Sequence, residues 1–189
     1  MPLRVLGGEL RGRTLFGGRG RAVRPTLGQV REALFSILGD RILGVAVLDC
    51  FAGSGALSIE ALSRGAARAT LLEQDAQALR VIGRNLEALG LTQRAAAVRT
   101  DARRWISRNP VGDFEIVFLD PPYAGPEGPA VLSALGSGAE LHPDALVTWE
   151  YAARRGAAPA ERVGRLELAV DRRYGETGLA VYRNRGAES

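Results

Sequence analysis

The chain has few of the residues that build disulfides, metal sites or lysine-based active sites. Its 189 residues include one cysteine, Cys50, and one histidine, His142, and all 25 basic residues are arginine. One cysteine cannot form an internal disulfide, and one cysteine with one histidine cannot complete a zinc site of the common Cys/His kind. The sequence therefore excludes a disulfide scaffold, a zinc finger and covalent chemistry at a lysine amine. We expect no bound metal, and we expect Cys50 to be a buried strand residue rather than a nucleophile.

The chain also lacks a long apolar run. No segment approaches the ~18 consecutive apolar residues of a membrane helix, and the N-terminus leads into glycine and arginine. Hydrophobic residues make up 46% and charged residues 24%, which is typical of a globular protein with a packed core. A length of 189 residues suits one domain. We therefore expect a soluble, cytoplasmic, monomeric protein without a membrane partner.

Positive charge is concentrated at the N-terminus. Residues 1–25 hold six arginines and one acid, a net charge of +5, whereas the other 164 residues sum to −1. Guanidinium groups pair with phosphates in a planar, bidentate way, so this segment predicts contact with a polyanion. A solvated tail is the alternative. We treat residues 1–25 as a basic N-terminal arm and residues 26–189 as the globular unit.

The arm and the segment after it carry local structure signals. Residues 3–6 and 13–16 are strand-like runs separated by glycines, which predicts a small hairpin. Thr26 can cap a helix that runs to about Leu38, where Gly39 ends it.

From residue 45 onward, apolar runs alternate with helical segments, which indicates βαβ units and a parallel sheet covered on both faces. Two later runs, 165–172 and 179–183, predict a closing antiparallel hairpin. We therefore expect an α/β fold with a mostly parallel seven-stranded sheet. The other expected strands are 45–50, 69–72, 95–98, 114–119 and 145–149, and the expected helices are 56–64, 75–89, 101–108 and about 128–136.

A glycine-rich loop follows the first of these strands. The strand ends at Asp49, and Gly53-Ser54-Gly55 opens directly into a helix. Glycine lets a ligand approach the backbone at the carboxyl edge of a parallel sheet. A dinucleotide G-x-G-x-x-G motif fits poorly, because its third glycine position is Ser58 and the carboxylate would repel a pyrophosphate. The same carboxylate would attract the sulfonium and ammonium of S-adenosylmethionine; a turn without a ligand is the alternative.

Acidic residues follow the next two predicted strands. Glu73 ends the second strand about twenty residues after the glycine loop, where a carboxylate can accept hydrogen bonds from both hydroxyls of an adenosine ribose. Asp101 and Ala102 follow the third strand, where they could meet the adenine amino group. An acid at either place can instead cap the following helix, so both interpretations stay open.

The sequence Asp120-Pro121-Pro122-Tyr123 ends the fourth predicted strand. Two prolines lock φ and restrict the residue before them, so the Asp120 side chain and the Pro121 carbonyl can point the same way. Two acceptors then converge on one donor group, such as the exocyclic amine of a nucleobase, and Tyr123 offers a face for stacking. The turn by itself is common, but its place after a glycine loop and at a later strand end makes it specific.

These motifs resemble class I S-adenosylmethionine-dependent methyltransferases. They are more closely similar to the bacterial RsmD-type enzymes, which methylate guanine N2 in small-subunit (16S) ribosomal RNA. The glycine loop and the Asp-Pro-Pro-Tyr turn specify only the superfamily, whereas the N-terminal arm and the following helix specify the branch. The resemblance covers nearly the whole chain and rests on residues 4–8, 11–13, 24–26, 31–35, 48–57, 60–65, 72–73 and 120–123.

The resemblance implies a Rossmann-like fold and a role for individual residues. Two positions depart from the family pattern. Gly28 stands where the family often has an acidic residue, and Ser36 where it often has asparagine, so RNA contacts at these positions are expected to differ. The implied sites are Asp49, Phe51, Gly53 and Gly55 at the methionine end of the cofactor, Glu73 at its ribose, Asp101 and Ala102 at its adenine, Asp120, Pro121 and Tyr123 at the target amine, and Arg4, Arg11, Arg13, Arg24, Thr26 and Arg31 at RNA.

The leading hypothesis is methyl transfer from S-adenosylmethionine to the N2 amine of a guanine in 16S rRNA or an assembling small subunit, with S-adenosylhomocysteine as product. An adenine-N6 DNA methyltransferase is the first alternative, because the same acceptors suit either amine. A glutamine methyltransferase is a further enzyme alternative, disfavoured by the arginine-rich arm. A non-catalytic RNA-binding protein on the same scaffold is the alternative from another class.

Overall fold

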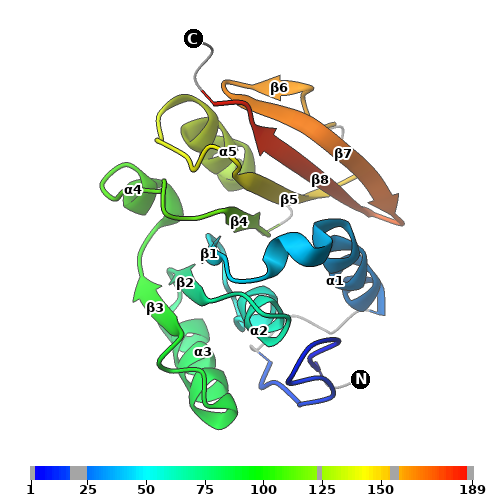
Figure 1. Ribbon diagram of the computed structural model, residues 1–189, viewed down its shortest axis with the longest axis vertical. Coiled ribbons are helices and arrows are strands. Elements are labelled where there is room, and N and C mark those ends of the chain that lie inside the picture. The colour runs from blue at the N-terminus through cyan, green and yellow to red at the C-terminus, as the bar shows by residue number, and fades with distance from the viewer. Residues whose placement is uncertain (1–2, 18–24, 123–124, 154–157, 187–189) are drawn as a thin grey trace.

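A computed structural model describes residues 3–17, 25–122, 125–153 and 158–186 of the chain (Figure 1). Its centre is one mixed sheet with the strand order β3-β2-β1-β4-β5-β8-β7-β6. The strands β1 to β5 pair in parallel, and β8 runs antiparallel to β5. The bounds are β1 Ala46–Asp49, β2 Arg68–Glu73, β3 Ala95–Arg99, β4 Ile116–Leu119, β5 Leu146–Ala152, β6 Arg162–Val163, β7 Leu166–Tyr174 and β8 Thr177–Asn184.

The expected mostly parallel sheet with a closing antiparallel hairpin is confirmed, but it has one strand more than the seven predicted. All seven predicted runs form strands, and the two-residue β6 adds an eighth in the described part of the chain. It pairs with β7 through only two residue pairs, Arg162 with Glu167 and Val163 with Leu166. A strand of two residues has no period to detect, because alternation needs at least four.

The helices cover both faces of the sheet (Figure 1). Side chains alternate across a strand, so Val47 of β1 packs with the helices on one face and Leu48 with those on the other. The first face is covered by α1 Pro25–Leu38, α2 Ala56–Ser63 and α3 Ala76–Leu89, and the second by α4 Ala102–Ile106 and α5 Glu127–Ser137.

The helix boundaries agree with the expected ones to within two residues. The helix α1 begins at Pro25, so Thr26 lies inside the first turn and is not the capping residue. A short 3-10 helix, Gly39–Ile42, follows it. The Asp75 carboxylate caps α3 by accepting hydrogen bonds from two backbone N–H groups, and Gly90 ends α3 with φ +69°. Among the described residues, none of the helices is long and apolar enough to cross a membrane.

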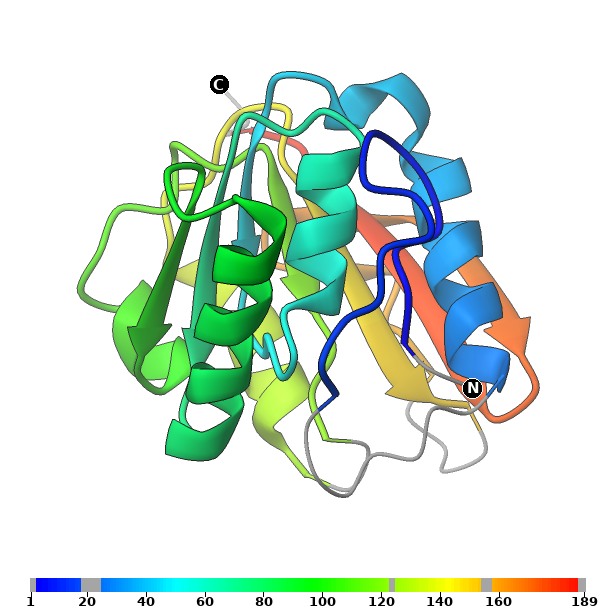
Figure 2. The ribbon, with the colours of Figure 1, turned by 90° about the horizontal axis from the view of Figure 1, so that it is seen from below.

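The described part of the N-terminal arm, residues 3–17, is packed against the globular unit. Its two ends pair antiparallel through a bridge between Arg4 and Thr14, with the Leu15 N–H donating to the Leu3 carbonyl at 2.8 Å, so the predicted hairpin is present in a short form. Val5 and Leu15 are buried in the core. Figure 2 shows the arm lying beside α2, on the side of that helix that faces α1. The solvated-tail alternative is therefore wrong for these residues.

Gly8 is required where the arm meets the end of α2. Its φ is +75°, and an added Cβ would lie 1.8 Å from the Ser63 carbonyl oxygen. That oxygen accepts a hydrogen bond from the Glu9 N–H at 2.8 Å, so it cannot move away freely.

We expect Gly8→Ala to undock the arm, and Gly12→Ala to serve as the matched control. Gly12 has a similar φ, +85°, but nothing lies within 4 Å of an added Cβ. Gly12→Ala should lower the free energy of unfolding by about 1 kcal/mol, because alanine is disfavoured in the left-handed conformation. Gly8→Ala should lower it by more than about 2 kcal/mol, because the clash with the Ser63 carbonyl is added. Urea unfolding measures both, and amide hydrogen exchange at Leu6 reports the undocking. Equal losses for the two variants would contradict this account.

Candidate functional site

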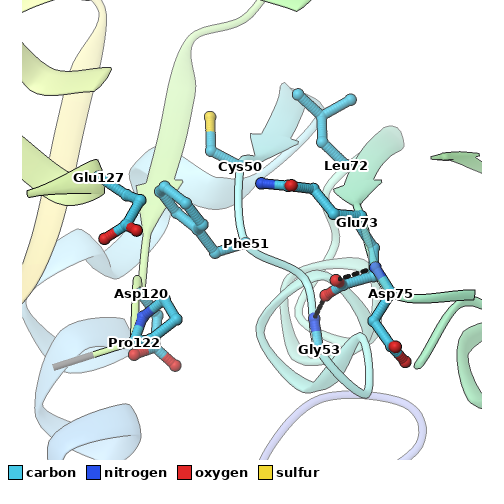
Figure 3. A pocket seen from close by; sticks show the side chains of 10 residues that line it. Cys50, Phe51, Gly53, Leu72, Glu73, Asp75, Asp120, Pro122 and Glu127 are labelled. Atoms are coloured by element: carbon cyan, nitrogen blue, oxygen red, sulfur yellow. Dashed lines mark hydrogen bonds between the residues drawn. The ribbon is translucent and has the colours of Figure 1, made fainter. Parts of the chain in front are cut away.

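A cleft of about 260 Å³ opens at the carboxyl ends of β1, β2 and β4 (Figure 3). Its volume lies just below the roughly 300 to 1,000 Å³ usual for ligand pockets, so a bound small molecule would remain partly open to solvent. One wall comes from the segment after β4 and the start of α5, and the opposite wall comes from the end of β2. The lining residues are Cys50, Phe51, Gly53, Leu72, Glu73, Gln74, Asp75, Asp120, Pro122 and Glu127.

The topology of the sheet explains why the cleft lies here. The strand β1 has β2 on one side and β4 on the other, so the chain order reverses at β1. Open α/β sheets bind ligands at such a switch point, outside the carboxyl ends of the strands. The glycine loop, Glu73 and Asp120 follow three neighbouring strands, and the structure brings them together as expected.

The glycine loop after β1 depends on two left-handed residues. Gly53 has φ +58° and Gly55 has φ +79°. Gly55 precedes α2, and its N–H donates to the Ala52 carbonyl at 2.7 Å. An added Cβ at Gly55 would lie 3.1 Å from the Leu71 side chain, so this glycine also allows close packing of α2 on the sheet. Gly53 lines the cleft, whereas Gly55 shapes the loop from beneath it.

Glu73 holds the loop in place from the end of β2. Its Oε2 accepts from the Gly53 N–H at 2.8 Å, and its Oε1 accepts from the Asp75 N–H at 2.9 Å (Figure 3). A carboxylate oxygen has a second lone pair, so both oxygens can also accept from ligand hydroxyls in the cleft. The predicted residue is therefore at the predicted place and has an added structural role.

Asp49 lies beneath the cleft and does not line it. Its side chain is buried; Oδ2 accepts from the Ser58 hydroxyl at 2.9 Å, and Oδ1 has no hydrogen-bond partner among the described residues. Burial raises the pKa of Asp49 to about 7, and the nearby Asp120 and Glu73 carboxylates add to the rise. A buried carboxyl oxygen that has no hydrogen-bond partner and lies beside a cleft can stabilise a cation bound there.

The turn after β4 places Asp120 and Pro122 in the wall of the cleft (Figure 3). Pro121 is buried behind this wall, where an added Cβ on Gly128 would lie 2.7 Å from its ring. Tyr123 lies outside the described residues. The Asp120 carboxylate lies close enough to Asp49 to contribute to the raised pKa of that carboxyl.

The predicted adenine residues lie beside the cleft rather than in its lining. Asp101 caps α4 by accepting from the Arg104 N–H at 2.8 Å, and its Oδ2 accepts from the Gln74 side chain at 3.2 Å. Gln74 itself lines the cleft. Ala102 is buried as the first residue of α4. The helix-capping alternative for Asp101 is confirmed, and its contact with adenine stays a prediction.

Sequence reasoning missed several lining residues. Leu72, Gln74 and Asp75 flank Glu73 at the end of β2, so proximity in sequence could have found them. Glu127 comes from α5, and only the packing of that helix brings it next to Asp120 (Figure 3).

Cys50 follows β1 directly and is buried, as expected, although it also lines the cleft. Burial raises the pKa of its thiol, and the Asp49 carboxylate adds to the rise, so the nucleophilic thiolate is disfavoured. Among the residues that the structure describes, no group of three or more His, Cys, Asp or Glu side chains could hold a metal ion.

The arginines predicted to bind RNA divide into exposed and buried ones. Arg4, Arg11 and Arg13 are exposed on the arm. Arg24 and the Thr26 side chain lie outside the described residues.

Arg31 is the exception, because its side chain is 8% exposed and its Nη2 donates to the Arg4 carbonyl at 2.5 Å. Burial lowers the pKa of Arg31, and the Glu60 and Glu150 carboxylates oppose this change. Its guanidinium therefore supports the arm from below instead of presenting a charge at the surface.

A buried carboxylate that sequence reasoning did not single out fixes the arm. Glu60 of α2 is fully buried, and its two oxygens accept from the Leu6 and Gly7 N–H groups at 2.8 Å each. Oε1 also accepts from Arg64 Nε at 2.8 Å. Arg31 Nε lies 3.8 Å from Oε2. This network explains why an arginine-rich segment packs in one conformation.

Comparison with known proteins identifies the family. The family model described as "Conserved hypothetical protein 95" matches residues 3–183. The chain belongs to this family. It is 36% identical over 187 residues to "Putative rRNA methyltransferase YlbH" of Bacillus subtilis, covering 97% of this chain and 100% of that protein.

Two further relatives place the family among methyltransferases. The chain is 42% identical over 121 residues to "Ribosomal RNA small subunit methyltransferase D" of Escherichia coli strain K12, which covers 64% of this chain and 60% of that protein. The solved structure "Putative methyltransferase yhhF from Escherichia coli" has a TM-score of 0.86 and 32% identity, covering 97% of this chain and 98% of that chain. The expected RsmD-type resemblance and Rossmann-like fold are confirmed, and the protein is a methyltransferase of this family.

The buried Asp49 predicts a specific pH dependence of stability. The unfolded carboxyl has a pKa near 3.9 and the folded one about 7, so the folded state binds the proton more tightly. The free energy of unfolding therefore falls as pH rises from about 4 to 8, by at most about 4 kcal/mol. In Asp49→Asn this contribution is absent, so the variant should gain stability relative to the wild type over this range.

Urea unfolding of both proteins at several pH values measures the difference. Asp113→Asn is the control, since Asp113 is exposed and precedes β4 at the opposite edge of the sheet. A constant difference between Asp49→Asn and wild type from pH 4 to 8 would show that the carboxyl titrates normally.

Proposed function

We propose that this methyltransferase transfers a methyl group from S-adenosylmethionine to the N2 amine of a guanine in 16S rRNA. The observation that carries the proposal is the convergence of the glycine loop, Glu73 and Asp120 on one cleft above the buried Asp49. The name of the Bacillus subtilis relative supports rRNA as the substrate, and the name of the Escherichia coli relative supports the small subunit. The cytoplasm, where such an RNA is found in bacteria, is the proposed location, and a monomer is the proposed state.

The residues present suit this cofactor. Asp49 Oδ1 is buried without a partner and can stabilise a positive charge, and the left-handed Gly53 leaves room for close approach. Phe51 would contact the methionine end, Glu73 would accept from the ribose hydroxyls, and Gln74 with the neighbouring Asp101 and Ala102 would meet the adenine. When bound, the cofactor supplies an activated methyl group, which is the demanding part of the chemistry.

Asp120 has the central role toward the target amine. The N2 amine is a weak nucleophile because its lone pair is delocalised into the ring, and acceptors on its N–H bonds favour the attacking form. A bond from this nitrogen to the methyl carbon would form as the carbon–sulfur bond breaks and S-adenosylhomocysteine leaves, and the nitrogen would carry a positive charge until its proton passes to water. The Asp120 carboxylate stabilises this positive charge, and the Pro121 carbonyl is the proposed second acceptor. Tyr123 is the proposed stacking surface for the base.

The basic arm is proposed to bind the RNA. Arg4, Arg11 and Arg13 are exposed on a segment that the buried Glu60 holds against α2. A base paired within a helix cannot enter the cleft, so the target is a single-stranded or flipped guanine. Residues 1–25 and 26–189 would thus be an RNA-binding arm and a catalytic unit.

The decisive experiment compares rRNA nucleosides from cells with and without this protein by mass spectrometry. The proposal expects one N2-methylguanine to disappear from 16S rRNA when the protein is absent and to return when it is supplied. Loss of an N6-methyladenine from DNA instead would favour the first alternative. Binding of 16S rRNA without any change in methylation would favour a non-catalytic protein.

We expect Asp120→Ala to lose about 10² to 10³-fold of the methylation rate, because one charge-stabilising group is removed. The variant should remain folded and should still bind S-adenosylhomocysteine, which calorimetry measures. Asp113→Ala, at the opposite edge of the sheet, is the control and should keep full activity. Methylation by Asp120→Ala at close to the wild-type rate would show that Asp120 does not have the proposed role.

We expect the double variant Arg11→Ala and Arg13→Ala to bind 16S rRNA more weakly and with a flatter salt dependence. Each lost phosphate contact lowers the slope of log Kd against log salt by roughly one. Filter binding between about 50 and 200 mM salt measures the slope. An unchanged slope would show that these two arginines do not contact the phosphate backbone.

A further inference from the structure

A buried asparagine joins the N-terminal arm to the glycine loop. Asn85 lies in the middle of α3 and is 1% exposed. Its Oδ1 accepts from the Phe16 N–H at 2.8 Å, and its Nδ2 donates to the Phe16 carbonyl at 3.0 Å. The same Nδ2 donates to the Ser54 carbonyl at 2.9 Å. One amide group thus holds both backbone groups of an arm residue and one carbonyl of the loop.

Both ends of this connection are parts of proposed ligand sites. Ser54 stands between Gly53, which lines the cleft, and Gly55, which precedes α2. On the other side, the Phe16 ring is 39% exposed and carries the Arg84 guanidinium 3.5 Å from its centre. The Phe16 ring and the Arg84 guanidinium therefore form an aromatic and cationic surface on the arm. The backbone of Phe16 is joined through Asn85 to the loop beside the cleft.

The bonding of Asn85 makes the two segments depend on one another. If the arm residue moves away, the amide loses two of its three partners, and a buried amide group without partners is unfavourable. If the loop opens, the Ser54 carbonyl loses its donor and Nδ2 keeps only one acceptor. Ordering either segment therefore fixes the amide that orders the other.

We propose that Asn85 couples the two ligand sites, so that RNA on the arm and S-adenosylmethionine in the cleft strengthen each other's binding. The inference rests on the proposed function, since it needs both ligands. Asn85 is a positioning residue in this scheme: it touches neither ligand and acts through Phe16 and Ser54. The first ligand stabilises the connected arrangement of arm and loop against its opening, and the second then binds with a smaller loss of conformational entropy.

The coupling is measured as a ratio of dissociation constants. Calorimetry gives the Kd of S-adenosylhomocysteine for the wild-type protein alone and with saturating unmodified 16S rRNA transcript. Filter binding gives the Kd of the same transcript without and with saturating S-adenosylhomocysteine. We expect each Kd to fall by the same factor, within the range of about 5- to 150-fold that coupled sites show. Asn85→Asp keeps the acceptor toward the Phe16 N–H but loses both donated bonds, so the factor should fall to nearly one.

The matched control is Asn184→Asp at the end of β8. Asn184 is also a buried asparagine, and its Nδ2 donates to the His142 carbonyl at 2.9 Å on the opposite edge of the sheet. A general loss of packing would affect both variants, whereas loss of coupling is expected only for Asn85→Asp. An Asn85→Asp variant that keeps the wild-type coupling factor would overturn the proposal.

Hydrogen exchange tests the same proposal without any substitution. Addition of S-adenosylhomocysteine alone should slow exchange of the Phe16 amide several-fold, and addition of RNA alone should slow exchange of the Gly53 amide. Protection confined to the segment nearest each ligand would overturn the coupling.

The two proposals fail in different ways. Two ligands that both bind the wild type with a coupling factor of one would overturn this inference and leave the proposed function intact. Absence of binding by either ligand would overturn both.

Discussion

The parallel direction of β2, β1 and β4 is the constraint on which the site depends. Parallel neighbours end at the same edge of a sheet, so residues far apart in the chain reach one cleft. The buried cores of β1 and β4 fix their register, because a slip by one residue would turn every side chain to the opposite face. The positions of Glu73 and Asp120 are therefore set by the packing of the whole sheet.

The same edge concentrates negative charge. Asp49, Glu73 and Asp120 approach one another, and only Asp49 is fully buried. Its raised pKa shows that the ionised form is disfavoured in the free protein, and the Ser58 hydroxyl offsets only part of this cost. A ligand with a sulfonium and an ammonium shifts the Asp49 carboxyl toward its ionised form, since a nearby positive charge stabilises a carboxylate. Stability of the free protein is thus lowered where a cation is to be held.

The arm shows how a charged segment becomes part of a core. Its backbone N–H groups bind the buried Glu60 carboxylate, and Val5 and Leu15 contribute apolar surface to the core next to α1 and α2. The exposed arginines then project from a fixed backbone, which reduces the conformational entropy lost when a phosphate chain binds. Asn85 extends this rigid attachment from the arm to the loop that lines the cleft.

Local patterns in the sequence determined the order and type of nearly every element, because apolar runs and helical periods are properties of neighbouring residues. They also marked Glu73 and Asp120, since residues at the carboxyl ends of parallel strands lie at the same edge of the sheet. Tertiary structure alone decided the eight-stranded sheet, the burial of Arg31, and the roles of Glu60 and Asn85. Glu60 bonds to Leu6 and Asn85 to Phe16, partners more than fifty residues away in the chain, and no local period records which partners the packing will provide.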